Sequence, residues 1–335
     1  MTSPSKTNLI VVNEKQRKNR FISSVFMSRA TIFHPSSSLT PTMKSKLIEV
    51  AQNGGTNPNT PLESIKMNSA DKNFRIDLHS DYLLQPHRDI LDTTLAYAQI
   101  IKLDDVSYNA GKKVAWSEVY QMINNDDQQE RQADSAESLI DTDATILSMS
   151  LYELAERLGV TTTPTNIERI TRNITQLATA HLVINELDDK QQVIKKRPLS
   201  FIQDYRFCCD RSRLETNNNS VNHVFLIPDK RLLQAIRDDG YFYRLDQQKI
   251  FEYSKPSTRS FLKYITSYRA ELLHQKSLEW ALERYLLSIA SKVSHNFRNN
   301  LRQDLLDNSK LIEDHFGLQF RDTDTGQKIF YTGLT

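Results

Sequence analysis

The chain has 335 residues, 39% of them apolar, and its 43 lysines and arginines nearly balance its 41 acidic residues to give a formal net charge of +2. This length suits two domains with real hydrophobic cores, and the small charge excludes binding of nucleic acid through bulk positive charge. No apolar run approaches the roughly 20 residues that span a bilayer, and the polar N-terminus lacks a signal-peptide core, so we expect a cytoplasmic protein with no membrane partner.

Residues 1–70 are rich in Ser, Thr, Asn, Lys and Pro, a composition typical of loop or disorder. We therefore expect a flexible N-terminal arm. Its basic cluster KQRKNR (15–20) fits a solvated tail and a phosphate-contacting arm equally well. The apolar residues of ATIFHP (30–35), with Phe21, Val25 and Phe26, are available to dock on a partner or on the fold.

A first domain is expected over residues 71–210. FRIDLHSDYLL, from Phe74, reads as a strand, and residues 85–101 place apolar side chains at helical spacing. The acidic, polar segment 124–143 has little to bury and is expected to be a mobile insert in a loop.

Two helices and a hairpin complete this domain. A compact helix is expected to begin at the Ser150 cap and end at Gly159, and Thr165 is placed to cap the next helix. Residues 182–207 are then expected to form a hairpin with a polar tip. Ile167, Ile170, Ile174 and Leu177 mark the inner face of the second helix. Its outer face offers Arg169, Arg172, Asn173 and Gln176, and the returning strand of the hairpin carries Lys195, Lys196 and Arg197.

A second domain is expected over residues 221–335. It opens with the strand HVFLIP and includes a helix that turns Phe261, Leu262, Ile265 and Tyr268 inward. A helix capped by Ser277, a long helix from Ser294 that stops at Gly317, and a second hairpin follow. The outer face of the long helix offers Asn296, Arg298, Asn299, Arg302 and Gln303, and the hairpin carries Arg321 and Lys328.

The same order of short helix, polar-faced helix and hairpin therefore occurs twice, and it is the order of a winged helix. We predict an α+β protein with two tandem winged-helix domains and a disordered N-terminal arm. A bundle that merely alternated helices and hairpins would show the same order. The polar faces hold the side chains that read base edges, since Arg pairs with guanine and Asn or Gln with adenine.

From Arg75 to Tyr331 the chain resembles plasmid replication initiators of the TrfA and IncQ RepC type. The matching segments are RIDLHSDYLLQPHRDILDTTLAYAQ, SLYELAERLG with NIERITRNITQL, VFLIPDKRLLQAI, YFYRLDQQKIFEYSKPSTRSFLKYITSYR, and the closing helix and hairpin. The resemblance implies binding to directly repeated origin sites (iterons) on double-stranded DNA, with recognition helices at Thr165–Ala180 and Ser294–Phe316. Two modules one helical turn apart predict a site near 20 base pairs. It also implies origin opening, recruitment of a host initiator and helicase, plasmid copy control and a possible homodimer.

Other classes of protein find less support. There is no P-loop, no His-hydrophobe-His triplet, no HExxH and no nucleophile elbow, so we expect no enzyme, no metal and no cofactor. His295, Arg298, His315 and Tyr331 follow the order of tyrosine recombinases, but an upstream Arg motif is missing. Adjacent Cys208 and Cys209 are expected to be reduced. The main alternative function is that of a winged-helix transcriptional regulator that binds a palindromic operator. A protein that acts purely as a scaffold is the third candidate.

Overall fold

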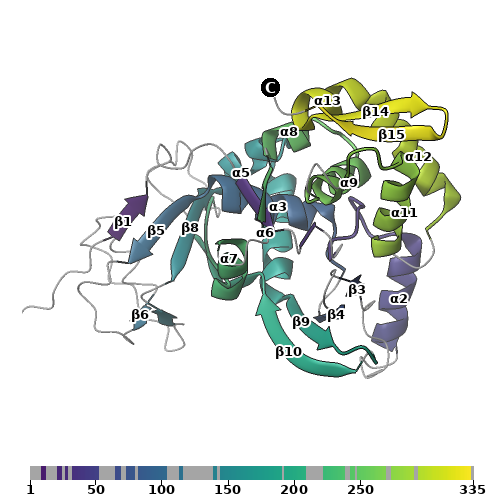
Figure 1. Ribbon diagram of the computed structural model, residues 1–335. Coiled ribbons are helices and arrows are strands. Elements are labelled where there is room, and N and C mark those ends of the chain that lie inside the picture. The colour runs from purple at the N-terminus through teal and green to yellow at the C-terminus, as the bar shows by residue number, and fades with distance from the viewer. Residues whose placement is uncertain are drawn as a thin grey trace, which may run out of the picture.

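A computed structural model shows two bodies of mixed helix and sheet lying side by side (Figure 1). It describes residues 9–12, 21–24, 27–28, 32–52, 65–68, 73–79, 82–103, 113–115, 139–141, 144–190, 192–208, 222–237, 242–245, 247–268, 273–289 and 293–332. The predicted acidic insert lies outside the described residues, apart from the short strand β7 (Leu139–Asp141), which pairs with β6 (Lys113–Ala115).

An antiparallel five-stranded sheet forms one side of the first body, with the strand order β1-β5-β8-β12-β11. The apolar run HVFLIP is β12, and it pairs with β8 so that Leu226 lies opposite Leu147. The predicted boundary at residue 221 is therefore misplaced, because β12 belongs to the first core. The bounds are β1 Leu9–Val12, β5 Gln99–Leu103, β8 Thr145–Ser150, β11 Ile202–Cys208 and β12 His223–Pro228.

A second antiparallel sheet has the order β10-β9-β4-β3, with β10 at one edge. Its strands are β3 (Ile65–Asn68), β4 (Asn73–His79), β9 (His181–Leu187) and β10 (Val193–Ser200). The Asp188 carboxylate caps the β9–β10 turn by accepting from the backbone N–H groups of Lys190 and Gln192 at 2.9 and 2.8 Å. The predicted hairpin is thus present, but β4 and β3 extend it into a larger sheet.

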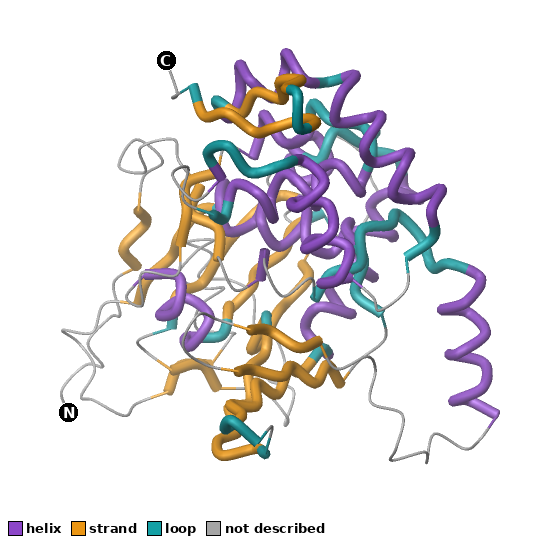
Figure 2. The backbone as a smooth tube through the Cα atoms, turned by 45° about the vertical axis from the view of Figure 1, so that its right-hand side comes forward, coloured by secondary structure: helices purple, strands orange, loops and turns teal. Residues whose placement is uncertain are grey.

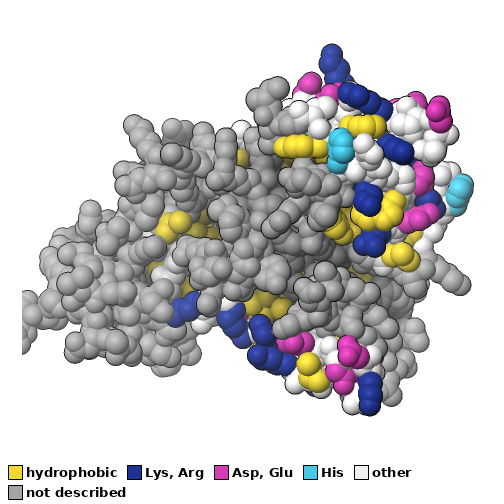
Figure 3. Space-filling model, in the orientation of Figure 1, with side chains coloured by type: hydrophobic (Ala, Val, Ile, Leu, Met, Phe, Trp, Pro, Cys, Tyr) yellow, Lys and Arg dark blue, Asp and Glu magenta, His cyan; other side chains and the backbone are white. Residues whose placement is uncertain are grey.

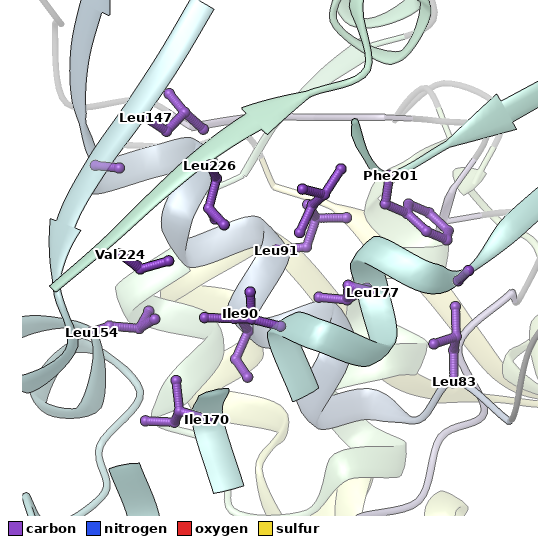
Figure 4. Close-up of a cluster of buried hydrophobic side chains, with 14 of the residues drawn as sticks. Leu83, Ile90, Leu91, Leu147, Leu154, Ile170, Leu177, Phe201, Val224 and Leu226 are labelled. Carbon is purple, nitrogen blue, oxygen red and sulfur yellow. The ribbon is translucent and has the colours of Figure 1, made fainter. Parts of the chain in front are cut away.

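Three helices pack on the first core: α3 (Gln85–Tyr97), α5 (Leu151–Arg157) and α6 (Pro164–Thr179). The Ser150 hydroxyl caps α5 as predicted, whereas α6 begins two residues earlier than predicted, with Thr163 in place of Thr165 at the cap position and Pro164 after it. Apolar side chains of these helices and of the five-stranded sheet converge in this core, as Figure 4 shows for Leu83, Ile90, Leu91, Leu147, Leu154, Ile170, Leu177, Phe201, Val224 and Leu226.

The second body holds five helices and a hairpin among its described residues. The serine caps predicted for α11 and α12 are present, since Ser277 and Ser294 accept from the N–H groups of Trp280 and Phe297. The elements are α8 Gln247–Phe251, α9 Pro256–Thr266, α11 Leu278–Ile289, α12 His295–Asp307, α13 Ser309–Phe316, β14 Leu318–Thr323 and β15 Gly326–Tyr331.

The predicted long helix is broken into two, and the hairpin is bridged by the segment that precedes α11. At Asn308 the side-chain amide donates to the Asp304 carbonyl at 2.7 Å, which separates α12 from α13. Gly317 then ends α13 in the left-handed conformation, with φ of 65°. The segment before α11 pairs with β15, because Gln275 N–H donates to the Ile329 carbonyl and Ile329 N–H donates to that of Lys276, both at 2.8 Å.

The middle of the N-terminal segment is part of the fold, which differs from the flexible arm expected over residues 1–70. Ile32 and Phe33 are buried in the first core, and the Phe33 ring centroid lies 5.2 Å from that of Phe201. Burial of these two apolar side chains outweighs the polar composition around them. Helix α2 (Pro41–Gln52) follows these residues, and upstream of them β2 (Phe21–Ser24) pairs with β13 (Phe242–Leu245). Helix α7 (Lys230–Arg237) precedes β13 in the chain.

The two bodies meet where α3 packs against α9 (Figure 1). The Lys263 ammonium of α9 lies 2.9 Å from a carboxylate oxygen of both Asp89 and Asp92 on α3. Arg88 reaches Asp92 at 2.7 Å, and Arg259 reaches Asp89 at 3.2 Å. All of these side chains except that of Arg259 are at least 96% buried. We call Arg88, Asp89, Asp92, Arg259 and Lys263 the α3–α9 ion network.

Within the described part of the chain, no helix combines the length and the apolar character needed to cross a membrane.

Candidate nucleic-acid interface

The exposed face of α6 keeps two of its four predicted cationic or amide side chains free for a partner. Arg169 and Arg172 are exposed, while Ile170, Ile174 and Leu177 are buried on the opposite side. Asn173 differs from the prediction and is only 8% exposed. It lies three residues after Ile170 and four before Leu177, a spacing that puts it on the core side of the helix.

The fourth residue of this face, Gln176, is tied to α3. The Nδ1 atom of His87 accepts from the Leu84 backbone N–H at 3.0 Å, so Nε2 carries the ring proton and donates to Gln176 Oε1 at 2.8 Å. Burial lowers the pKa of His87, as does the nearby positive charge of Arg172. A neutral histidine thus fixes Gln176 at the edge of the α6 face.

This arrangement predicts a loss of stability in mild acid. Below the ordinary histidine pKa of 6.5, the unfolded chain takes up a proton at His87 that the folded chain resists, so the free energy of unfolding falls as the pH falls. The slope from this group is at most about 1.4 kcal/mol per pH unit. Urea unfolding at several pH values should show a weaker dependence for His87→Gln than for wild type.

Strand β10 presents three consecutive exposed cations. Lys195, Lys196 and Arg197 are all exposed, and Arg197 lies 3.9 Å from the Glu186 carboxylate. In Figure 3, Lys and Arg side chains gather along the lower edge of the molecule, where β10 runs. Charges and a proline, here Pro198, also discourage pairing at the edge of a sheet. The cations of β10 therefore fit phosphate contact and edge protection alike.

Helix α12 divides its predicted polar face into two rows. Asn296, Asn299 and Gln303 are exposed, and Gln303 Nε2 donates to Asp307 Oδ1 at 2.7 Å. Arg298 and Arg302, one turn apart, lie in a separate row that faces α11. Asn296 and Asn299 are thus exposed to a partner, Gln303 is exposed but paired with Asp307, and the arginines are engaged within the protein.

Glu279 of α11 engages both arginines. Its Oε2 accepts from Arg298 Nη2 at 2.6 Å, and its Oε1 accepts from Arg302 Nε at 2.9 Å. Arg298 Nη2 also lies 3.3 Å from Glu283, and Arg302 Nη2 donates to Gln327 Oε1 of β15 at 2.9 Å. The bond to Glu279 raises the pKa of Arg298. These contacts join α11, α12 and the hairpin.

The β14–β15 hairpin holds its two predicted cations differently. Arg321 is exposed, donates to Gln319 and places its guanidinium 5.2 Å from the centroid of the Phe330 ring. Lys328 is half-buried, at the point where β15 pairs with Ser277. Arg321 is therefore the more accessible of the two.

The two hairpins lie at opposite ends of the molecule. In Figures 1 and 2, which differ by a turn about the vertical axis, β14–β15 is at the top and β9–β10 at the bottom. The packed helices α3 and α9 lie between them. The predicted DNA-binding residues therefore form two separate groups.

Sequence reasoning did not single out Glu279, Gln327, His87 or the α3–α9 ion network. Glu279 stands in the first turn of α11, where an acidic residue reads as a favourable helix start. A signal for the ion network was available on α3, since Arg88 and Asp92 are one turn apart and can pair along the helix. Its partner Lys263 is 171 residues distant from Asp92.

The residues that follow the order of tyrosine recombinases have separate surroundings. His315 Nδ1 lies 3.4 Å from the Tyr253 hydroxyl, and its Nε2 lies 3.6 Å from Glu252. Arg298 is held by Glu279, and Tyr331 is exposed at the end of β15. Each of these side chains thus has a structural role or a surface position.

Comparison with protein-family models found no match, and neither did comparison with curated proteins. Among solved structures, the chain is similar to crystal structures of domains 2 and 3 of RctB. One, a selenomethionine derivative, has a TM-score of 0.47 and 12% identity over 81% of this chain and 90% of that chain. Another has a TM-score of 0.42 and 9% identity over 81% and 91%. A likeness of this degree assigns no function to the chain.

Proposed function

We propose that this protein is a plasmid replication initiator that binds directly repeated origin sites on double-stranded DNA through two winged-helix units. The first unit is α3, α5, α6 and β9–β10, and the second is α9, α11, α12, α13 and β14–β15. The observation that carries the proposal is the repeated order of a polar-faced helix and a hairpin, with exposed cations or amides on each. No enzymatic step and no cofactor is proposed.

The chemistry of the two groups supports duplex DNA as the partner. Arg169 and Arg172 on α6, with the cations of β10, supply charge for phosphates and guanidinium groups for guanine. On α12, Asn296, Asn299 and Gln303 supply amides suited to adenine. A chain of nearly neutral net charge with exposed cations on α6 and β10 fits a local rather than a general affinity for nucleic acid.

The placement of the units supports a long site. Because the hairpins lie at opposite ends and the first helices of the units pack together, the units fit two successive stretches of one duplex. Modules spaced by one helical turn cover about 20 base pairs. Origin opening, recruitment of a host initiator and helicase, and a dimer that represses are further parts of the proposal, supported by the resemblance to plasmid initiators.

Footprinting on the DNA beside the gene tests the proposal. An initiator should protect direct repeats of about 20 base pairs next to an AT-rich tract. Protection of one inverted repeat would instead identify a transcriptional regulator. Absence of protection on any adjacent DNA would contradict both.

Substitutions on α6 and α12 separate base readers from phosphate contacts. Arg172→Ala should cost about 1–3 kcal/mol of binding at one base position if Arg172 reads guanine. The same is expected of Arg302→Ala, although Glu279 and Gln327 hold that side chain in the free protein. Binding to a panel of single-base variants of the protected site is the measurement. A uniform loss across the panel would mark the arginine as a phosphate contact.

A further inference from the structure

Two arginines of α12 share one carboxylate of α11. Glu279 bridges Arg298 and Arg302, with one oxygen 2.6 Å and the other 2.9 Å from the nitrogen that it faces. The side chains of these three residues are 44%, 35% and 40% exposed. The group is therefore open to solvent, so another anion can reach either arginine.

This arrangement makes the arginine row of the second unit electrically neutral. Arg298 and Arg302 contribute two positive charges, and Glu279 with Glu283 contributes two negative charges within 3.3 Å of them. In the first unit, the Glu186 carboxylate comes only within 3.9 Å of Arg197 on β10. The two units thus offer very different attraction to a phosphate backbone.

We propose that Glu279 is a specificity-determining residue that withholds Arg298 and Arg302 from backbone phosphates and keeps their guanidinium groups in fixed positions for a matching duplex. This inference rests on the proposed function as a DNA-binding protein. Arg302 is held from two sides, by Glu279 on α11 and by Gln327 on β15, so its orientation is defined before any partner arrives. A phosphate must compete with Glu279 for the same N–H groups.

The consequence is a lower affinity for DNA of the wrong sequence. Specificity is a difference between affinities, and it grows when contacts available to every sequence are removed. Because the Glu279 pairs are exposed, they are weak and a duplex can displace them. The expected effect of Glu279 is therefore several-fold rather than all-or-none.

Glu279→Gln in the full chain tests the inference. The glutamine keeps the size of the side chain and removes the charge, so a phosphate no longer competes with the Glu279 carboxylate for either arginine, while Glu283 and Gln327 stay in place. Anisotropy titrations with a labelled random-sequence duplex should show roughly 3- to 10-fold tighter binding at low salt. The slope of log K against log salt should steepen by up to about 2, near 0.9 for each new phosphate contact.

Three variants complete the design. Glu283→Gln, one turn further along α11 and in contact with Arg298 alone, should change binding less than about 2-fold. Glu279→Gln combined with Arg298→Ala and Arg302→Ala should lose the gain. Glu279→Asp, whose carboxylate is too short to bridge both arginines, should show a partial gain and gives a second test if the glutamine variant unfolds.

The outcomes separate this inference from the proposed function. If wild type binds duplex DNA and Glu279→Gln binds random duplex with the same affinity and salt slope, the role of Glu279 is overturned and the proposed function stands. If neither protein binds any duplex in a salt-dependent way, the proposed function fails and the inference fails with it.

Discussion

Replacing Asp92 by asparagine is expected to lower the free energy of unfolding by about 3–5 kcal/mol, the cost of breaking a buried ion pair. Asp92 is 0% exposed, and one of its oxygens accepts from both Arg88 at 2.7 Å and Lys263 at 2.9 Å. Asparagine has nearly the same shape and can still accept these hydrogen bonds. The expected loss of stability therefore comes from the removed negative charge. Without it, the buried cations Arg88 and Lys263 lose the carboxylate that they share.

The composition of the α3–α9 ion network predicts a ranking of variants. Three cations, Arg88, Arg259 and Lys263, face two carboxylates, Asp89 and Asp92. Lys263→Met removes the surplus charge and leaves each aspartate with one arginine, so it should cost less than Asp92→Asn.

Urea unfolding followed by circular dichroism measures both variants. Exposed Lys310→Met is the control and should stay within about 0.5 kcal/mol of wild type. If Lys263→Met lowers the free energy of unfolding more than Asp92→Asn does, the ranking predicted from the excess of cations over carboxylates is wrong. A loss below about 1 kcal/mol for Asp92→Asn would show that the network contributes little. Because the network joins the two units, the transition should also become less cooperative in Asp92→Asn.

The features that could be predicted from the sequence are local ones. Ser150 and Ser294 cap their helices, and Gly317 ends α13 in the left-handed conformation, because each depends on neighbours within one helical turn. The inner faces of α6 and α9 follow from the spacing of their apolar residues. Most helix and hairpin predictions among the described residues are of this kind.

The features that could not be predicted depend on distant partners. HVFLIP is a strand as expected, but its composition does not say whether it pairs with the first or the second body, and it pairs with β8. Glu279 meets Arg302 only after α11 and α12 have packed together. Asn173 shows that prediction can also fail within one helix. Its polar side chain lies at the border between the inner and outer faces of α6 and is buried. The DNA-binding roles of the predicted residues stay predictions.

Neutralising the cations of β10 is expected to have the largest effect on DNA binding. Lys195, Lys196 and Arg197 are exposed on an edge strand, and their replacement by glutamine removes three charges without disturbing the core. If each contacts a phosphate, the slope of log K against log salt should become shallower by about 0.9 per contact, or close to 3 in total. At physiological salt this corresponds to a loss of affinity on the order of 100-fold.

This loss should be the same for every sequence, because phosphates carry no base identity. Titrations with the protected site and with random duplex over a range of salt concentrations measure it. A variant with Lys44, Lys249 and Lys310 replaced by glutamine carries the same change of net charge on α2, α8 and α13, and should keep the wild-type slope. Equal losses in the two triple variants would show that β10 acts only through overall charge. Unchanged binding with new self-association would assign its cations to protection of the sheet edge instead.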